Sequence, residues 1–218
     1  IMGAGIAGLG FEKLVYGGLT KVFAGIVIAP IGGIIFGLLL TTLIITIFAS
    51  KRPGPVNKTF GKLQIVSSAW FALTHGANDG QKTMGIIVLI LFSAGMIPEL
   101  EMPLWVIFAA ATAMGLGTFF GGYKVIKTLG FKITKLRPYQ GFAAETAGGA
   151  MLAVFAVFGI PASTTHAITG TIMGAGAARR KRAVRWKVSR QIVFSWIITI
   201  PGAAAMGIGF TYLIHLFV

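Results

Sequence analysis

Long apolar stretches separated by short polar loops dominate the pattern of the chain. A helix needs about 20 mostly apolar residues to cross the hydrocarbon core of a bilayer. The pattern predicts membrane-crossing helices over residues 19–49, 63–97, 104–122 and 192–218. Pro30 lies inside the first of them and predicts a kink of the kind that helix bundles in membranes tolerate.

Charged residues are confined almost entirely to the loops between these stretches. Three loops are basic, at residues 51–62, 123–138 and 179–190, whereas the connection at 98–103 carries only Glu99 and Glu101. Because short basic loops stay on the cytoplasmic side of a membrane, we expect these three loops inside and residues 98–103 outside.

The segment between the second and third basic loops begins and ends on the same predicted side. Its apolar arm at 139–160 is broken by Pro161-Ala-Ser-Thr-Thr-His166, and the arm that follows, 167–178, is too short to cross at about 1.5 Å per residue. We therefore predict a re-entrant helical hairpin with its tip at membrane depth. Irregular backbone is tolerated there only inside protein or beside a water-filled cavity.

The second apolar stretch is interrupted by the polar run His75-Gly-Ala-Asn-Asp-Gly-Gln-Lys82. Gly76 and Gly80 would let the helix unwind there, which predicts a broken helix. An unwound stretch exposes carbonyl groups, and Asn78 and Asp79 would add hard oxygen ligands for a small cation. For Asn78 a simple helix cap is the alternative. An ionisable group at membrane depth, such as Asp79, is by default a functional candidate.

Composition agrees with a membrane protein. Hydrophobic residues make up 56% of the 218 and charged residues 11%, with a mean hydropathy of +0.86. Soluble domains carry about 25% charged residues. The net charge of +14 sits in the short loops and therefore indicates topology rather than binding to nucleic acid. The absence of cysteine excludes disulfides, zinc–thiolate sites and thiol catalysis.

An internal repeat divides the chain. Residues 1–5 recur as residues 172–176, and the same shift aligns Pro30 with Pro201. The two copies differ in charge and start on opposite predicted sides, which is typical of the inverted repeats of secondary transporters; two generic Gly/Ala-rich helices are the alternative. We predict the end of a first repeat at 1–49, a cytoplasmic linker at 50–62 and a second repeat at 63–218. The predicted fold is all-α, a polytopic membrane helix bundle with inverted repeats, a broken helix and a re-entrant helical hairpin.

Three hydroxyl side chains, Ser163, Thr164 and Thr165, begin the short helical arm after Pro161. A helix N-terminus presents free N–H groups and a positive dipole end, which suit an anion. The hydroxyls add donors without a charge, as an oxyanion that must be released requires. An ordinary N-cap by one of them is the alternative reading.

Other polar side chains near the two interruptions have open roles. Glu145 lies within an apolar arm and could bind a coupling cation, carry a proton or form a structural ion pair. Lys82 could be its partner or could face the anion, and Gln81 is a further candidate polar contact. His75 and His166 flank the interruptions, where a buried, hydrogen-bonded histidine is the more common state.

Three motifs resemble the inorganic phosphate transporter (PiT) family. They are HGANDGQKTMG at 75–85, GIPASTTHAITGTIMGAGAARR at 159–180 and GFAAETAGG at 141–149, in the order of that family's second repeat. The resemblance implies sodium- or proton-coupled import of phosphate, with each repeat giving part of a central site. The phosphate-binding residues would be Ser163, Thr164, Thr165, Gln81 and Lys82. The sodium-binding residues would be Asn78, Asp79 and Glu145. We also expect Asp79 and the Ser163–Thr165 tip to lie close together near the membrane midplane, because a coupled ion must lie near the anion.

The sequence thus predicts a secondary active phosphate importer with no covalent cofactor, driven by Na⁺ or H⁺. We expect a homodimer in a prokaryotic inner (plasma) membrane, in contact with lipid, and a missing N-terminal half that carries its own "GAND"-like run and Ser/Thr-Thr tip. A permease for sulfate or another tetrahedral oxyanion is the alternative. An enzyme with Ser163 as nucleophile and His166 as base lacks an acid to orient the histidine. A channel would have an open polar stripe along its helices.

Overall fold

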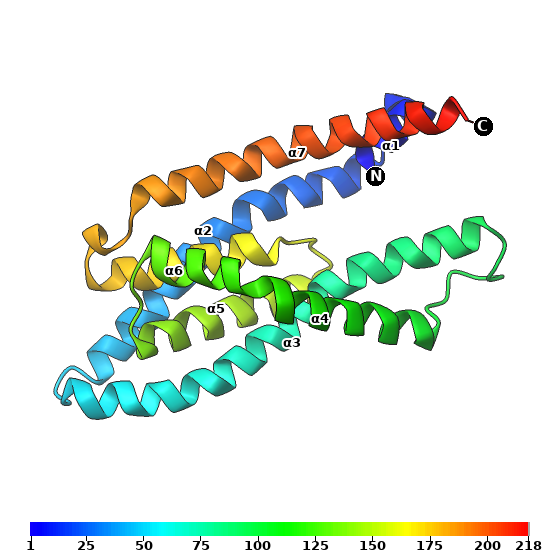
Figure 1. Cartoon of the computed structure of the whole chain (residues 1–218). Helices are drawn as coiled ribbons and strands as arrows, with labels where there is room; N and C mark the ends of the chain where they lie inside the picture. Colours follow the sequence, from blue (N-terminus) through cyan, green and yellow to red (C-terminus); the bar gives the residue numbers. More distant parts are fainter. Residues whose placement is uncertain (218) are drawn as a thin grey trace. The chain divides into compact units, whose positions relative to one another are not determined.

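The computed structural model describes residues 1–217, apart from the side chains of Lys124, Ile126 and Lys181. Its regular elements are helices (Figure 1). The longer ones are α1 (Met2–Leu9), α2 (Tyr16–Ile47), α3 (Pro53–Ser93), α4 (Leu104–Lys127), α5 (Pro138–Val157), α6 (Thr164–Arg179) and α7 (Trp186–His215). Short turns η1 (Phe11–Lys13), η2 (Thr128–Ile133) and η3 (Lys181–Ala183) join some of them. The chain forms two compact units, residues 1–23 with 185–218 and residues 24–184.

Four helical segments within the described residues are long and apolar enough to cross a membrane: Tyr16–Ile47, Leu104–Ile133, Pro138–Val157 and Trp186–His215. The first, second and fourth confirm the predictions at 19–49, 104–122 and 192–218. Helix α5 was predicted as a hairpin arm, yet by length and composition it could also cross. Helix α3 is not among the four, because the polar residues near its middle lower its hydropathy.

The predicted break at residues 75–82 is wrong, because α3 runs uninterrupted from Pro53 to Ser93. The amide nitrogen of Asn78 donates to the carbonyl of Thr74, 2.8 Å away and one turn back along the same helix. The glycines in this run permit unwinding but do not force it. Side-chain contacts one turn apart stabilise the helix instead.

All three predicted basic loops are partly helical, the third because α7 begins at Trp186. Residues 53–62 form the first turns of α3, which begins with Pro53, where a missing N–H costs no intrahelical hydrogen bond. Residues 123–127 continue α4, and the turn η2 follows as far as Ile133. The cytoplasmic placement of these segments stays a prediction.

Helices α5 and α6 form a hairpin whose connection spans residues 158–163 (Figure 1). Gly159 takes a positive φ of 61° in this connection, a conformation that favours glycine. The 16 residues of α6 measure about 24 Å, less than the roughly 30 Å of a bilayer core. The tip packs beside the middle of α3 rather than its end. These features support the re-entrant arrangement, which remains a prediction.

Helix α6 packs very closely on α2 through small residues. A methyl group placed on Gly33 would lie 2.7 Å from the carbonyl oxygen of Ala167, and one on Gly174 would collide with the carbonyl of Ile34. Such small-residue contacts let helix backbones approach where lipid offers no hydrophobic driving force for association. The position of the hairpin therefore depends on the glycines of this interface.

We expect Gly33→Ala to destabilise the protein. Overpacking a tight contact costs about 1–3 kcal/mol. Thermal unfolding of the full-length protein in detergent measures the effect. Gly117→Ala is the matched control, because a methyl group there meets nothing within 4 Å. Equal melting temperatures for the two variants would show that the α2–α6 contact is not tight.

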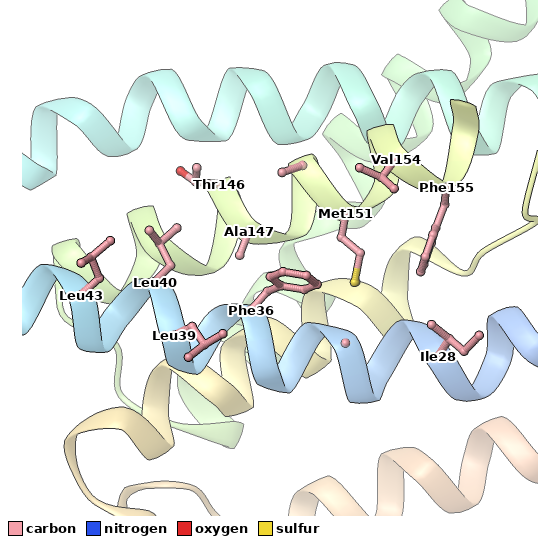
Figure 2. Close-up of a pocket in the computed structure, with 12 residues that line it drawn as sticks. Ile28, Phe36, Leu39, Leu40, Leu43, Thr146, Ala147, Met151, Val154 and Phe155 are labelled. Carbon is pink, nitrogen blue, oxygen red and sulfur yellow. The ribbon is translucent and has the colours of Figure 1, made fainter. Parts of the chain in front are cut away.

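An apolar cavity of about 460 Å³ lies between α2 and α5, with Phe36 and Met151 facing it from either side (Figure 2). It is lined by Ile28, Gly32, Phe36, Leu39, Leu40, Leu43, Thr146, Ala147, Ala150, Met151, Val154 and Phe155. No charged side chain is among these twelve residues, so the cavity is not a candidate anion site.

The boundaries of the helices follow the internal repeat of the sequence, whereas the division of the chain into two repeats stays a prediction. A shift of 171 residues carries α1 onto the end of α6, η1 onto the region of η3 and α2 onto α7, and both long helices contain the aligned prolines Pro30 and Pro201. In the unit of residues 1–23 and 185–218, Gly3 packs against Ala204 of α7, much as Gly174 packs against α2. The opposite orientation of the two copies in the membrane stays a prediction.

Candidate functional site

The middle of α3 meets the tip of the α5–α6 hairpin at the carboxylate of Asp79. On its own helix, Nε2 of His75 lies 3.2 Å from Oδ2, and Nζ of Lys82 lies 2.8 Å from Oδ1. From the hairpin, the hydroxyl of Thr164 donates to Oδ2 over 2.7 Å. These two residues are 85 positions apart in sequence. The prediction that Asp79 and the Ser163–Thr165 tip lie close together is confirmed.

The three hydroxyl side chains of the tip have different environments. The hydroxyl of Ser163 caps α6 by accepting from the backbone N–H of His166, 3.3 Å away. Thr164 is buried against Asp79, whereas Thr165 is exposed. Ser163 is therefore the N-cap of α6, and capping does not account for the hydroxyls of Thr164 and Thr165.

Lys82 joins the two halves of the cluster. Its ammonium donates to Oδ1 of Asp79 over 2.8 Å and to the carbonyl of Ala162, in the hairpin connection, over 2.9 Å. Lys82 thus contacts Asp79 and the hairpin rather than Glu145, and its other predicted role, facing the anion, stays a prediction. Gln81 lies on the same helix and is exposed.

Glu145 forms a second cluster with α3. Its Oε2 accepts from the hydroxyls of Ser67 and Ser68 at 2.6 and 3.0 Å, and its Oε1 accepts from the amide of Gln64 at 3.3 Å. Asp79 lies 12 residues after Ser67, about 18 Å along α3. Asn78, Asp79 and Glu145 were predicted as ligands of sodium. They are divided between two places and cannot bind one ion together.

Sequence reasoning missed the partners of Glu145. Gln64, Ser67 and Ser68 are spaced by three and four residues, which places them on one face of a helix. Gly141, one turn before Glu145, lets the Gln64 side chain pass, because a methyl group there would collide with it. A search for polar residues at helical spacing inside the apolar stretch would have found this face.

We expect Ser67→Ala to lower the thermal stability of the protein measurably. The substitution removes the shortest hydrogen bond to the Glu145 carboxylate, and bonds to charged groups contribute about 1.5–3 kcal/mol. The melting temperature of the full-length protein in detergent is the readout. Ser195→Ala provides the control, because that exposed hydroxyl bonds only to the carbonyl of Gln191 in its own helix. If both variants melt together, the Glu145 cluster does not stabilise the α3–α5 contact.

The two histidines occupy distinct settings. His75 lies beside Asp79, with its ring 6.0 Å from that of Phe71 in an edge-on arrangement. His166 is buried, and its ring hydrogen-bonds the backbone of Ile26 in α2. Ile26 lies four residues before Pro30, which has no N–H to offer its carbonyl. This contact gives His166 a structural role in joining α6 to α2.

The Asp79 cluster has the chemistry of a hard-cation or oxyanion site. No group of three or more His, Asp or Glu side chains that could bind a metal ion occurs in the described part of the chain. A cation at this carboxylate would be bound together with hydroxyl and carbonyl oxygens, as hard cations are.

Comparisons with known proteins concern the chain as a whole. The family model described as "Phosphate transporter family" (PHO4) matches residues 1–207. A "Probable low-affinity inorganic phosphate transporter" of Rhizobium meliloti (strain 1021) is 48% identical over 94% of the chain and 61% of its own length. A protein of the same description from Bacillus subtilis (strain 168) is 41% identical over 95% of the chain and 62% of its own length.

The fold also matches a solved structure. "The sodium-dependent phosphate transporter" superposes with a TM-score of 0.84 at 22% identity, over 100% of the chain and 72% of that structure. The chain spans about three fifths of the length of the two curated relatives. The protein is a membrane protein with several spanning helices and belongs to a family of transporters rather than enzymes. Because the family model matches residues 1–207, nearly the whole chain, the chain belongs to the phosphate transporter family.

Proposed function

We propose that this chain forms one wall of a secondary transporter that imports inorganic phosphate by symport with sodium or a proton. The observation that carries the proposal is the 2.7 Å bond from Thr164 to Asp79. It joins the N-terminus of α6, which suits an anion, to a carboxylate that suits a cation.

The N-terminus of α6 offers the phosphate contacts. The first N–H groups of a helix have no intrahelical partner. Ser163 already accepts from the N–H of His166, so the N–H groups of Thr164 and Thr165 are the donors available for an oxyanion. The exposed hydroxyl of Thr165 would add a further donor. All of these groups are neutral, which allows the anion to be released.

Asp79 gives a physical reason for coupling. A phosphate anion at the tip would be repelled by the carboxylate that Thr164 contacts unless a positive charge lies between them. Each ion then raises the affinity of the site for the other, and this mutual effect couples their transport. Glu145, about 18 Å away along α3, would serve a second cation or proton.

The remainder of the transporter would supply the opposite wall. The curated relatives extend well beyond the region they share with this chain. In inverted-repeat transporters the substrate lies at the interface between the repeats. We infer that the upstream repeat carries its own polar run and hydroxyl-bearing tip. Assembly as a homodimer and residence in a bacterial plasma membrane belong to the same proposal.

Uptake of radiolabelled phosphate by proteoliposomes of the full-length protein tests this function. We expect ion-driven accumulation that excess unlabelled phosphate abolishes and excess sulfate does not. At neutral pH phosphate carries an O–H group that can donate a hydrogen bond to a carboxylate such as Asp79, whereas sulfate has none. Equal competition by sulfate would favour the alternative of a general oxyanion permease, and no accumulation would reject both.

A further inference from the structure

The ammonium of Lys82 occupies the place where a coupling cation would bind. It lies 2.8 Å from Oδ1 of Asp79 and 2.9 Å from the carbonyl oxygen of Ala162. A carboxylate from α3 and a backbone carbonyl from the hairpin connection are the oxygen ligands that a small hard cation takes at a membrane-buried site. Nζ of Lys82 already satisfies both with charge-assisted hydrogen bonds of normal length.

A sodium ion and this ammonium exclude each other at Asp79. Both would need the same carboxylate oxygen and the same carbonyl, and two positive charges at such separation repel strongly away from bulk water. The remaining neighbours of the carboxylate are Nε2 of His75, at 3.2 Å, and the hydroxyl of Thr164, at 2.7 Å. Both approach the other oxygen, Oδ2, so they do not take the ammonium's position.

We propose that Lys82 is a tethered cation that takes the place of sodium at Asp79, so that no sodium ion binds at this carboxylate. The proposal rests on the proposed function and deepens it by identifying the positive charge beside the anion site. The ammonium supplies the positive charge that lets phosphate approach the carboxylate, and it is present without any bound ion. Sodium is then not needed to complete this site.

The groups around the ammonium are few. On α3 the ionisable neighbours are Asp79 and His75, and the hairpin contributes the carbonyl of Ala162 and the hydroxyl of Thr164. His166, the ionisable group of α6 nearest to the tip in sequence, is hydrogen-bonded to α2. The side chain of Lys82 is 48% exposed in this chain, so it can leave Asp79 without unfolding α3. Lys82 can thus contact a bound phosphate, the role predicted for it from the sequence.

Sodium binding can be measured without any transport assay. A ligand that binds only the folded protein raises its melting temperature. The full-length protein is melted in sodium chloride and in choline chloride at equal ionic strength. Five forms are compared: wild type, Asp79→Asn, Lys82→Ala, Lys82→Arg and the double variant Asp79→Asn/Lys82→Ala. Sodium bound elsewhere, for example near Glu145, contributes equally to all five and cancels in the comparison.

We expect Lys82→Ala to gain a sodium-specific rise in melting temperature, because removing the ammonium frees two oxygen ligands. The added Asp79→Asn change should abolish that rise, and Lys82→Arg, which keeps a positive charge, should not gain it. In the wild type, Asp79→Asn should leave the sodium effect unchanged. A wild-type sodium effect that depends on Asp79 would overturn the proposal, and so would a Lys82→Ala variant with no gain.

The transport arm of the same test uses ion gradients in proteoliposomes. Lys82→Ala should make phosphate uptake more dependent on sodium than uptake by the wild type, because sodium can then bind the freed oxygens at Asp79. An unchanged sodium dependence of uptake in Lys82→Ala would contradict the proposal. If neither a sodium nor a proton gradient drives uptake, the proposed function fails while the melting experiment still decides the identity of the ion at Asp79.

Discussion

Asp79→Asn should abolish ion-driven phosphate uptake while the protein still inserts into the membrane. The substitution keeps the size of the side chain and removes the charge that holds His75, Lys82 and Thr164. Hydrogen bonds to charged groups contribute about 1.5–3 kcal/mol each, and a loss of this size is roughly a 10- to 100-fold effect on affinity. We therefore expect initial uptake rates to fall at least tenfold.

The measurement is initial uptake by proteoliposomes of the full-length protein, normalised to the amount reconstituted. Glu99→Gln is the matched control, because this carboxylate is exposed in the connection between α3 and α4. The membrane fraction of both variants should contain similar amounts of protein. Undiminished, fully ion-dependent transport by Asp79→Asn would show that Asp79 is not part of the transport site.

Residues 1–218 expressed alone should not concentrate phosphate, whereas the same chain with the upstream repeat should. The Asp79 cluster lies on α3 and on the hairpin tip, and it supplies one set of contacts for the anion. The curated relatives are longer than the matched region by more than a third of their length. With the opposite wall absent, the anion would have too few contacts and no barrier against leakage.

Uptake by the 218-residue chain, by the full-length protein and by the two parts expressed together decides this prediction. Co-expression should restore uptake without a covalent link if the parts assemble. Ion-driven accumulation by the short chain as a monomer would contradict the account. The mass of the solubilised short chain distinguishes this result from two copies that pair in opposite orientations.

The sequence predicted the elements that local pattern determines. The long apolar runs of α2, α4 and α7 were identified because lipid demands continuous apolar length. The meeting of Asp79 with Thr164 also followed, since a symport site must bring its anion and cation contacts together. In both cases the prediction follows from a general requirement, of the membrane or of a symport site, applied to residues that can be read from the sequence.

Other features depend on contacts between distant segments. The run from His75 to Lys82 was predicted to unwind because of its glycines, yet α3 is continuous, since its polar side chains bond along the helix. The partners of Glu145 depend on how α5 packs beside α3, which the pattern of a single helix does not determine. Local propensity is a weak guide wherever tertiary contacts decide.

The most direct test of the central claim, that the hairpin tip beside Asp79 binds phosphate, uses the absence of cysteine from this chain. A single cysteine at the exposed Thr165 is alkylated in the full-length protein from which any upstream cysteines have been removed. The account predicts that phosphate slows this labelling saturably, whereas labelling of Ser195→Cys on α7 is unchanged. Equal labelling rates at Thr165→Cys with and without phosphate would contradict it.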